Sequence, residues 1–198
     1  MAQRHWAVEM KANSVSRVTI CNAALAMIGG NPISDLNDPT AEAQWCRNLY
    51  DQARRSLLRM HPWSCCVRRA SLPRLSVAPE FGWAYQYPLP ADFVRLVWLS
   101  GDDHSIEGGR VLSNRTPLEL VYVYDNDAES TWDDLLIEAM GLKMAALLAK
   151  PVSGSSTDAQ LREQQLQALL KRARAINAQE RPTQELTYAA SSLLEARR

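Results

Sequence analysis

Apolar residues recur at intervals of three and four near the start of the chain, which places them on one face of a helix. This first face carries Val18, Cys21, Leu25 and Ile28. Ser14 or Ser16 precedes it as a candidate N-cap, and Gly29–Gly30 and Pro32 follow it. Because glycine adopts the left-handed C-cap conformation at little cost, the pattern predicts a helix that ends at the two glycines.

A second amphipathic pattern begins at Thr40 and ends before Pro62. Its apolar face carries Cys46, Leu49, Ala53, Leu57 and Met60, widened by Trp45, Tyr50 and Leu58. Much of the remaining surface is charged and carries Arg47, Asp51, Arg54, Arg55 and Arg59. The pattern predicts a long helix with one buried and one largely basic side.

Two further helices are predicted in the last third of the chain. Ser130–Thr131 is a candidate cap for the third, with acidic residues in its first turn and Pro151 at its end. The fourth covers about residues 156–180, where glutamines surround a narrow apolar seam of Leu166, Leu169, Ala173 and Ile176. A helix of this kind packs either against a partner chain or on its own domain.

The stretch between these two pairs of helices, about residues 63–124, is typical of strands. It consists of short segments rich in β-branched and aromatic residues, separated by prolines. Gly108–Gly109 fits a two-residue hairpin turn, because both central residues of a type I′ turn need positive φ. The segment FVRLVWL, residues 93–99, is mostly apolar on both faces, which indicates a central or sandwiched strand. Cys65–Cys66, if they lie on a strand, point to opposite faces.

The predicted fold class is therefore α+β, mainly α: a bundle of about four helices with a small antiparallel β insertion and an extended C-terminal tail. We expect a helical domain from residues 14–62 and 128–180 and a β insertion from residues 63–127. Residues 1–13 form a polar arm, which lacks the apolar region of a signal peptide. Residues 181–198 carry apolar side chains with no domain left to pack on, so this tail is either frayed or ordered by a partner.

Composition and charge exclude several classes of function. The chain has 198 residues, enough for a core, and a formal net charge of zero. It therefore has no bulk electrostatic attraction to nucleic acid or to an anionic membrane. No apolar run reaches the roughly 18 residues of a membrane span. The cysteines form no metal-binding or disulfide framework and are interpreted as reduced thiols of a cytosolic protein: Cys21, Cys46, Cys65 and Cys66.

Candidate chemistry is sparse. The three histidines His5, His61 and His104 do not fall in a recognisable triad pattern, and no phosphate-binding glycine motif is present. The acidic residues between 102 and 134 lack the spacing of a calcium loop. Two basic clusters favour ion pairs or an interface over nucleic-acid contacts: Arg54, Arg55 and Arg59, then Arg68, Arg69 and Arg74. We expect no enzymatic activity, and no catalytic residue, metal or cofactor.

The order of landmarks resembles the adaptor proteins between the portal and the tail of tailed bacteriophages, also called head-to-tail connectors or tail tubular protein A. Residues 22–33 read NAALAMIGGNPI, similar to the family's opening helix. The second helix of the family has an aromatic residue and arginines before a tryptophan. This chain matches it with Tyr50, Arg54, Arg55 and Leu58, followed by His61-Pro62-Trp63. A Y.LP.D motif follows at Tyr87, Leu89, Pro90 and Asp92. The resemblance covers about residues 15–180; it departs at Cys65–Cys66, where the family often has an aromatic.

The resemblance implies a structural role in the virion, at the head-to-tail junction, after assembly in the host cytoplasm. Such a protein forms a homo-oligomer, a twelve-subunit ring under the portal protein. The ring extends the channel for genomic double-stranded DNA without sequence-specific contact and offers a platform for the next tail protein. The family's C-terminal segment docks on the portal, which points to Leu186, Tyr188, Leu193 and Leu194 here. The interface for the next tail component is expected at Ile106, Gly108, Gly109 and Arg110.

The aromatic window at residues 83–99, WAYQYPLPADFVRLVWL, has several readings: a ligand pocket, a stacking platform, a seam between subunits or a structural joint. We interpret it as a joint that holds the β insertion on the helices, made by Trp63, Tyr87, Leu89, Pro90 and Trp98. Two other classes of protein stay open as alternatives. One is a DNA-binding regulator that uses the basic clusters, and the other is a small cytosolic hydrolase that uses the aromatic window.

Overall fold

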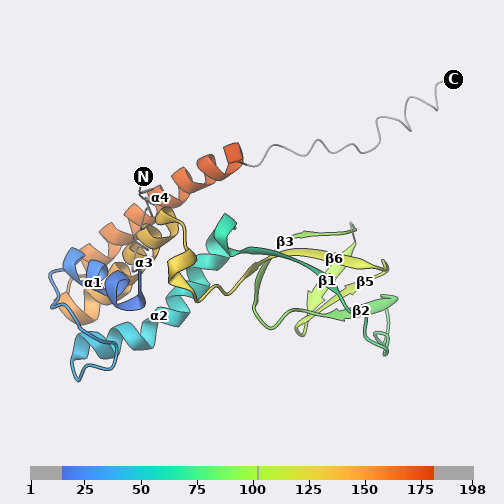
Figure 1. The fold of residues 1–198 in the computed structure, drawn as a ribbon, viewed down its shortest axis with the longest axis horizontal. Coiled ribbons are helices and arrows are strands. Elements are labelled where there is room, and N and C mark those ends of the chain that lie inside the picture. Colours follow the sequence, from blue (N-terminus) through green and yellow to red (C-terminus); the bar gives the residue numbers. More distant parts are fainter. Residues whose placement is uncertain (1–14, 102, 181–198) are drawn as a thin grey trace, which may run out of the picture.

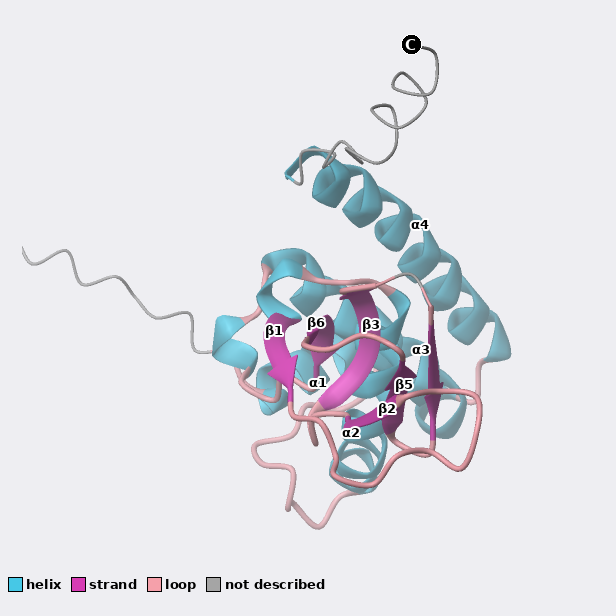
Figure 2. Cartoon of the chain, turned by 90° about the vertical axis from the view of Figure 1, so that its right-hand side faces the viewer, coloured by secondary structure: helices cyan, strands magenta, loops and turns pink. Residues whose placement is uncertain are grey.

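The computed structural model describes residues 15–101 and 103–180, with side chains described as far as residue 176. These residues form an α+β fold with four α-helices and two small antiparallel sheets. Figure 1 shows the helices at one end of the molecule and the strands at the other. Viewed from the strand end, the strands lie in front of the helices (Figure 2). In the described parts of the chain, no helix is both long enough and apolar enough to cross a membrane.

The helices are α1 (Arg17–Met27), α2 (Ala41–Met60), α3 (Asp134–Ser153) and α4 (Ser156–Glu180). The α1 helix begins as predicted, because Ser16 and Thr19 form a reciprocal capping box. Gly29, with φ of 72°, follows its last turn. The apolar faces of the four helices meet in the first core, to which α4 contributes Leu166, Leu169, Leu170 and Ala173. Trp45 lies outside this core and is exposed, so the predicted apolar face of α2 was too wide.

Both predicted ends of α3 need correction. The segment Glu129–Thr131 forms a separate 3-10 turn, and the N-cap of α3 is Asp133, whose carboxylate accepts a hydrogen bond from the N–H of Leu135. Pro151 lies inside the helix rather than after it. Proline has no N–H to donate to the carbonyl four residues earlier, and its ring crowds that carbonyl, but only two residues of the helix follow Pro151. The helix ends instead at Gly154, which has φ of 70° and caps it in the left-handed conformation.

Six strands form the two sheets: β1 (Val67–Leu72), β2 (Tyr85–Pro88), β3 (Phe93–Leu99), β4 (His104–Glu107), β5 (Arg110–Ser113) and β6 (Leu118–Tyr124). The strand order is β1-β6-β3 in the first sheet and β2-β5-β4 in the second. The β4–β5 hairpin has the predicted turn, with φ of 57° at Gly108 and 74° at Gly109. The two sheets enclose a second core of Leu72, Tyr87, Leu99, Val111, Leu118, Leu120 and Tyr122.

The central strand of the first sheet is β6, and β3 lies at its edge, which corrects the prediction for residues 93–99. Two register shifts in β3 break the strict alternation of its side chains. As a result Phe93, Leu96 and Leu99 all contact the second core, while Val94 and Val97 contact the first. The apolar character of both faces therefore reflects contact with two cores rather than a central position.

Cys65 and Cys66 also differ from the prediction, because they lie in the 3-10 turn Ser64–Cys66 and not on a strand. This turn joins α2 to β1. The N–H of Cys66 donates to the carbonyl of Trp63 at 2.9 Å, which closes the turn. The sulfur atoms of Cys65 and Cys66 are 3.7 Å apart.

Candidate functional site

Charged side chains connect α2 to the segment that follows β6. The Nε of Arg54 donates to Asp125 Oδ1 at 2.9 Å, and the guanidinium of Arg55 donates to Asp125 Oδ2 at 2.7 Å. Arg54 also contacts Asp51 at 2.8 Å. Arg54 is buried, and a buried charge is tolerated only when it is paired. These contacts therefore hold the strand end of the molecule against the helical end.

The same network reaches α1. The guanidinium of Arg17 contacts Glu129 at 3.0 Å and Asp51 at 3.1 Å, and it lies 5.3 Å from the centre of the Tyr50 ring. Burial and the nearby Glu129 raise the pKa of Tyr50, so its phenol stays neutral. Two helices and the 3-10 turn before α3 are thereby joined at one point.

Asp125 has a lowered pKa. Burial alone would raise the pKa of this carboxyl, but the hydrogen bonds and positive charges of Arg54 and Arg55 outweigh burial. The carboxylate is therefore ionised over the physiological pH range. It acts as a structural anion that balances two guanidinium groups.

Asp92, the acid of the Y.LP.D motif, connects all three strands of the first sheet. Its carboxylate accepts hydrogen bonds from Arg68 on β1 at 2.7 Å and from the hydroxyl of Tyr122 on β6 at 3.0 Å. Its carbonyl accepts from the N–H of Asp125 at 2.8 Å. The Arg68 guanidinium also lies 3.5 Å from the centre of the Tyr124 ring. The motif thus fixes the start of β3 beside the end of β6.

The NAALAMIGGNPI segment is also closed by specific contacts. The side-chain amide of Asn22 donates to the carbonyl of Ile33 and accepts from its N–H, both at 2.8 Å. A Cβ added at Gly30 would lie 2.9 Å from Leu25 and 3.0 Å from Val152, so only glycine fits this position without movement. The two ends of the landmark are therefore held together by side-chain and backbone contacts.

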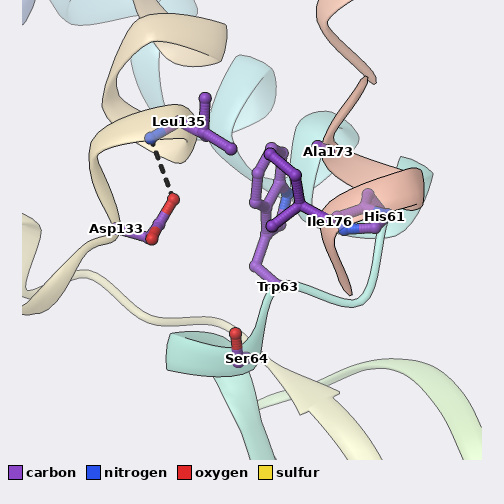
Figure 3. A pocket seen from close by; sticks show the side chains of 7 residues that line it. All are labelled: His61, Trp63, Ser64, Asp133, Leu135, Ala173 and Ile176. Atoms are coloured by element: carbon purple, nitrogen blue, oxygen red, sulfur yellow. Dashed lines mark hydrogen bonds between the residues drawn. The ribbon is translucent and has the colours of Figure 1, made fainter. Parts of the chain in front are cut away.

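A shallow hollow lies where α2, α3 and α4 meet the turn that leads to β1 (Figure 3). Its lining combines apolar and polar side chains: His61, Trp63, Ser64, Asp133, Leu135, Ala173 and Ile176. The ring of Trp63 is almost fully buried and occupies the centre of this view. The His61 ring meets it edge-on, with centroids 4.6 Å apart.

Ser64, His61 and Asp133 in this hollow are the residue types of a hydrolytic triad, so their relative positions decide whether they could act as one. In a triad the imidazole lies between the hydroxyl and the carboxylate. Here Asp133 and His61 lie on opposite sides of the Trp63 ring (Figure 3). The Asp133 carboxylate caps α3. The hollow therefore has the architecture of a helix junction.

The five residues predicted to form one joint occupy four places. Trp63 lies in the first core, whereas Tyr87 and Leu89 contact the second core. Pro90 begins the turn that leads into β3. Trp98 lies on the edge strand and is 50% exposed. Strand β3 and Tyr124 contact both cores, and the pairs of Arg54 and Arg55 with Asp125 connect the same two ends of the molecule.

The hairpin residues predicted to meet the next tail component lie at one end of the second sheet. Ile106 is 40% exposed on β4, and Gly108 and Gly109 form the turn. Arg110 begins β5. The carbonyl of Gly109 accepts a hydrogen bond from the N–H of Leu89 at 3.0 Å. The turn therefore lies beside the segment that leads into the helix-side end of β3.

The β1–β2 loop, residues 73–84, carries exposed apolar side chains that the sequence reasoning missed. Phe81 is 87% exposed and Val77 is 68% exposed. The loop follows the end of β1 that is distant from the helices. Phe81 stands between Pro79-Glu80 and Gly82, which is a turn signal rather than a strand pattern. That context could have identified it as an exposed aromatic.

The predicted portal-binding residues lie outside the described residues. They are Leu186, Tyr188, Leu193 and Leu194. The segment that carries them follows α4, whose Ala173 and Ile176 line the hollow at Trp63.

Cys65 is the partly exposed member of the adjacent cysteine pair, and Cys66 is buried. A hydrogen bond from Cys66 and another from the backbone N–H of Asp133 outweigh burial and lower the pKa of Cys65 to about 7. Within residues 15–101 and 103–180, no three His, Cys, Asp or Glu side chains are grouped as metal ligands would be. The lowered pKa favours the thiolate of Cys65, which is the form of a cysteine that reacts, whereas Cys66 is buried beside it.

Comparisons with protein-family models and with curated proteins give no significant match to this chain.

Proposed function

We propose that this chain is a structural head-to-tail adaptor of a tailed bacteriophage. In this proposal it forms a ring of identical subunits under the portal and works at the head-to-tail junction of the virion. The ring extends the channel for genomic DNA and provides the attachment platform for the next tail protein. The chain carries no enzymatic activity and uses no cofactor.

The observation that supports this proposal most is the order and position of the three landmark segments. Each lies at a structural junction: Asn22 closes the first segment, Trp63 lies between the helices and β1, and Asp92 connects three strands. The motifs resemble those of one family in the same order, and each occupies a junction, which supports the proposal of a shared architecture. The function is then inferred from the resemblance.

The distribution of surfaces also supports an adaptor. The molecule is elongated, with helices at one end and strands at the other (Figure 1). The strand end exposes Phe81, Trp98 and Ile106, and in this proposal they belong to its interaction surfaces. A subunit with separate helical and strand ends can contact one partner at each end.

The alternative of a DNA-binding regulator is less well supported, because much of the basic surface is engaged within the chain. Arg54 and Arg55 contact Asp125, and Arg68 contacts Asp92. Their charges are balanced before any phosphate could approach. A regulator of this kind would bind DNA with strong salt dependence, whereas we expect weak binding of the free protein.

Removal of residues 181–198 tests the proposal on the portal side. In this proposal the segment becomes ordered only on the portal; ordering costs about 1–2 kcal/mol per residue in backbone entropy, so each copy would bind weakly and a ring of copies strongly. We expect the truncated chain to lose loading onto portal rings in a sedimentation assay. As a matched variant, the full-length chain with Leu186, Tyr188, Leu193 and Leu194 replaced by serine should fail in the same way. Normal loading of both would contradict the proposal.

A variant of the β4–β5 hairpin turn tests the proposed contact with the next tail protein. Replacement of Gly108 and Gly109 by bulky residues disfavours the positive φ that the turn requires. We expect this variant to bind portal but to block attachment of the next tail component. Loss of portal binding with retained tail attachment would reverse the orientation that we propose.

A further inference from the structure

Cys65 and Cys66 place two thiols side by side in the turn that joins α2 to β1. Their sulfur atoms are 3.7 Å apart, which leaves no room for another atom between them. Cys66 is fully buried in the first core, whereas Cys65 packs against that core and is partly exposed. A reagent in solution can therefore reach Cys65, and Cys66 lies directly behind it.

Hydrogen bonds hold the backbone of this turn on both sides of the pair. The carbonyl of Cys65 accepts from the side chains of Asn126 at 3.2 Å and Tyr124 at 3.4 Å. The N–H of Cys66 donates to the carbonyl of Trp63 at 2.9 Å. These contacts fix the backbone from which both thiols project, so the two sulfur atoms stay neighbours in the folded chain.

The two thiols differ in how readily they lose a proton. The pKa of Cys65 is lowered to about 7, because the hydrogen bond that Cys66 donates to its thiolate outweighs burial. The same contact raises the pKa of Cys66, together with burial and the negative charge of Cys65. When Cys65 has reacted and lost its charge, two of these three causes disappear. Cys66 then becomes easier to deprotonate, which favours reaction in the order Cys65 first and Cys66 second.

We propose that Cys65 and Cys66 form a dithiol site that small-molecule disulfides oxidise, with Cys65 as the attacking thiolate and Cys66 as the resolving thiol. In the first step the Cys65 thiolate attacks one sulfur of the reagent, so that a mixed disulfide forms and one thiolate leaves. In the second step Cys66 loses its proton to solvent and attacks the Cys65 sulfur, and the other half of the reagent leaves as a thiolate. The products are one disulfide between Cys65 and Cys66, two reduced thiolates and one proton.

A disulfide between adjacent residues is easily reversed. Adjacent Cα atoms lie about 3.8 Å apart, below the range of about 4.4–6.8 Å that is usual for disulfides, so the bond is strained and readily reduced. The site therefore responds to a change from reducing to oxidising surroundings. This chemistry goes beyond the adaptor function and does not depend on it.

Reaction of the folded full-length chain with one equivalent of dithiobisnitrobenzoate tests the site, because each step releases one coloured thionitrobenzoate anion. Free thiols are then blocked with N-ethylmaleimide and the chain is digested with trypsin. Peptide 60–68 carries both thiols of the site, whereas the other two cysteines lie in peptide 18–47. We expect two anions per chain and a peptide 60–68 that has lost two hydrogen atoms, carries no adduct and regains the hydrogens with dithiothreitol. A peptide 60–68 that keeps a thionitrobenzoate adduct, stays reduced or is cross-linked to a second chain would overturn the proposal.

Two matched variants separate the roles of the thiols. Cys66→Ser keeps a hydrogen-bond donor beside Cys65, so it should release one anion and retain the adduct on Cys65. Cys65→Ser removes the exposed nucleophile and should slow the release at least about 10-fold, because the remaining cysteines are buried. Two anions from Cys66→Ser, or unchanged release from Cys65→Ser, would also overturn the proposal. Circular dichroism checks that both variants fold, and the result for the wild-type peptide stands without them.

Discussion

Replacement of Asp125 by asparagine perturbs the contact that holds the helical and strand ends together. The carboxylate accepts one hydrogen bond from Arg54 and one from Arg55, at 2.9 and 2.7 Å. Asparagine has nearly the same shape, but it has no charge and one of its two polar atoms is a donor. One guanidinium therefore loses its acceptor, and both lose the compensating negative charge.

The magnitude follows from the burial of the two arginines. The side chain of Arg55 is 51% exposed, and an exposed ion pair contributes about 0–1 kcal/mol. Arg54 is buried, and a hydrogen bond to a buried charged group contributes about 1.5–3 kcal/mol. Arg54 keeps its contact with Asp51, which limits the loss. We expect Asp125→Asn to lower the free energy of unfolding by about 2–3 kcal/mol and the melting temperature by about 4–12 °C.

Urea denaturation followed by circular dichroism measures this change, with Arg55→Ala as the control that should cost less than about 1 kcal/mol. The pKa of Asp125 is lowered in the folded state, so its stabilisation is present above the unfolded pKa of about 3.9 and is lost as the pH falls further. The difference between wild type and Asp125→Asn should therefore shrink below about pH 4. Equal stability of the two proteins at pH 7 would refute the account of the joint.

Three further predictions concern the landmark segment and the reactive thiol. Asn22→Ala leaves both backbone groups of Ile33 without their partner, so it should lower the unfolding free energy by about 2–3 kcal/mol in urea denaturation; a change below 0.5 kcal/mol would contradict this role. Gly30→Ala places a methyl group 2.9 Å from the end of the Leu25 side chain and 3.0 Å from that of Val152, which must shift; because alanine also restricts the unfolded chain, the net cost should be about 1 kcal/mol, detected as a melting temperature lower by about 2–4 °C, and an unchanged or higher melting temperature would refute it. Alkylation of Cys65 by iodoacetamide, followed by peptide mass spectrometry, should accelerate through about pH 7; a midpoint at the ordinary value of about 8.5 would be inconsistent with this lowered pKa.

The helices were predictable where local sequence decides them. Ser16, one of the two predicted caps of α1, and the two glycines of the β4–β5 turn act through their own backbone and side chains, so residue type indicated both features. The ends of α3 were harder to predict from the sequence. Either Ser130 or Asp133 can cap a helix, and in the structure Asp133 does so, directly after Trp132, whose side chain is buried in the first core.

The sheets could not be derived from periodicity alone. The register shifts in β3 produce a spacing that resembles a doubly buried strand, and only the pairing with β6 reveals the edge position. Long-range charge pairs have no local signature either. The pairs of Asp125 with Arg54 and of Asp92 with Arg68 join residues that are distant in the sequence.

The candidate surfaces were predicted in part. The hairpin turn was located by its glycines, but sequence could not place it beside Leu89 at the helix-side end of β3. Trp98 was interpreted as part of a joint because an aromatic in an apolar strand is usually buried, yet its position at the sheet edge leaves it half exposed. Phe81 was overlooked because it lies among turn residues, two positions before the aromatic window that begins at Trp83, and carries no periodic signal.

Electron microscopy of the purified full-length chain, mixed with rings of the portal protein encoded in the same genome, tests the central claim most directly. The adaptor function predicts portal particles with an additional ring of density on one face, coaxial with the portal channel. Residues 181–198 should be required for this density. Portal rings that remain unchanged at saturating concentrations of the chain would contradict the proposed function.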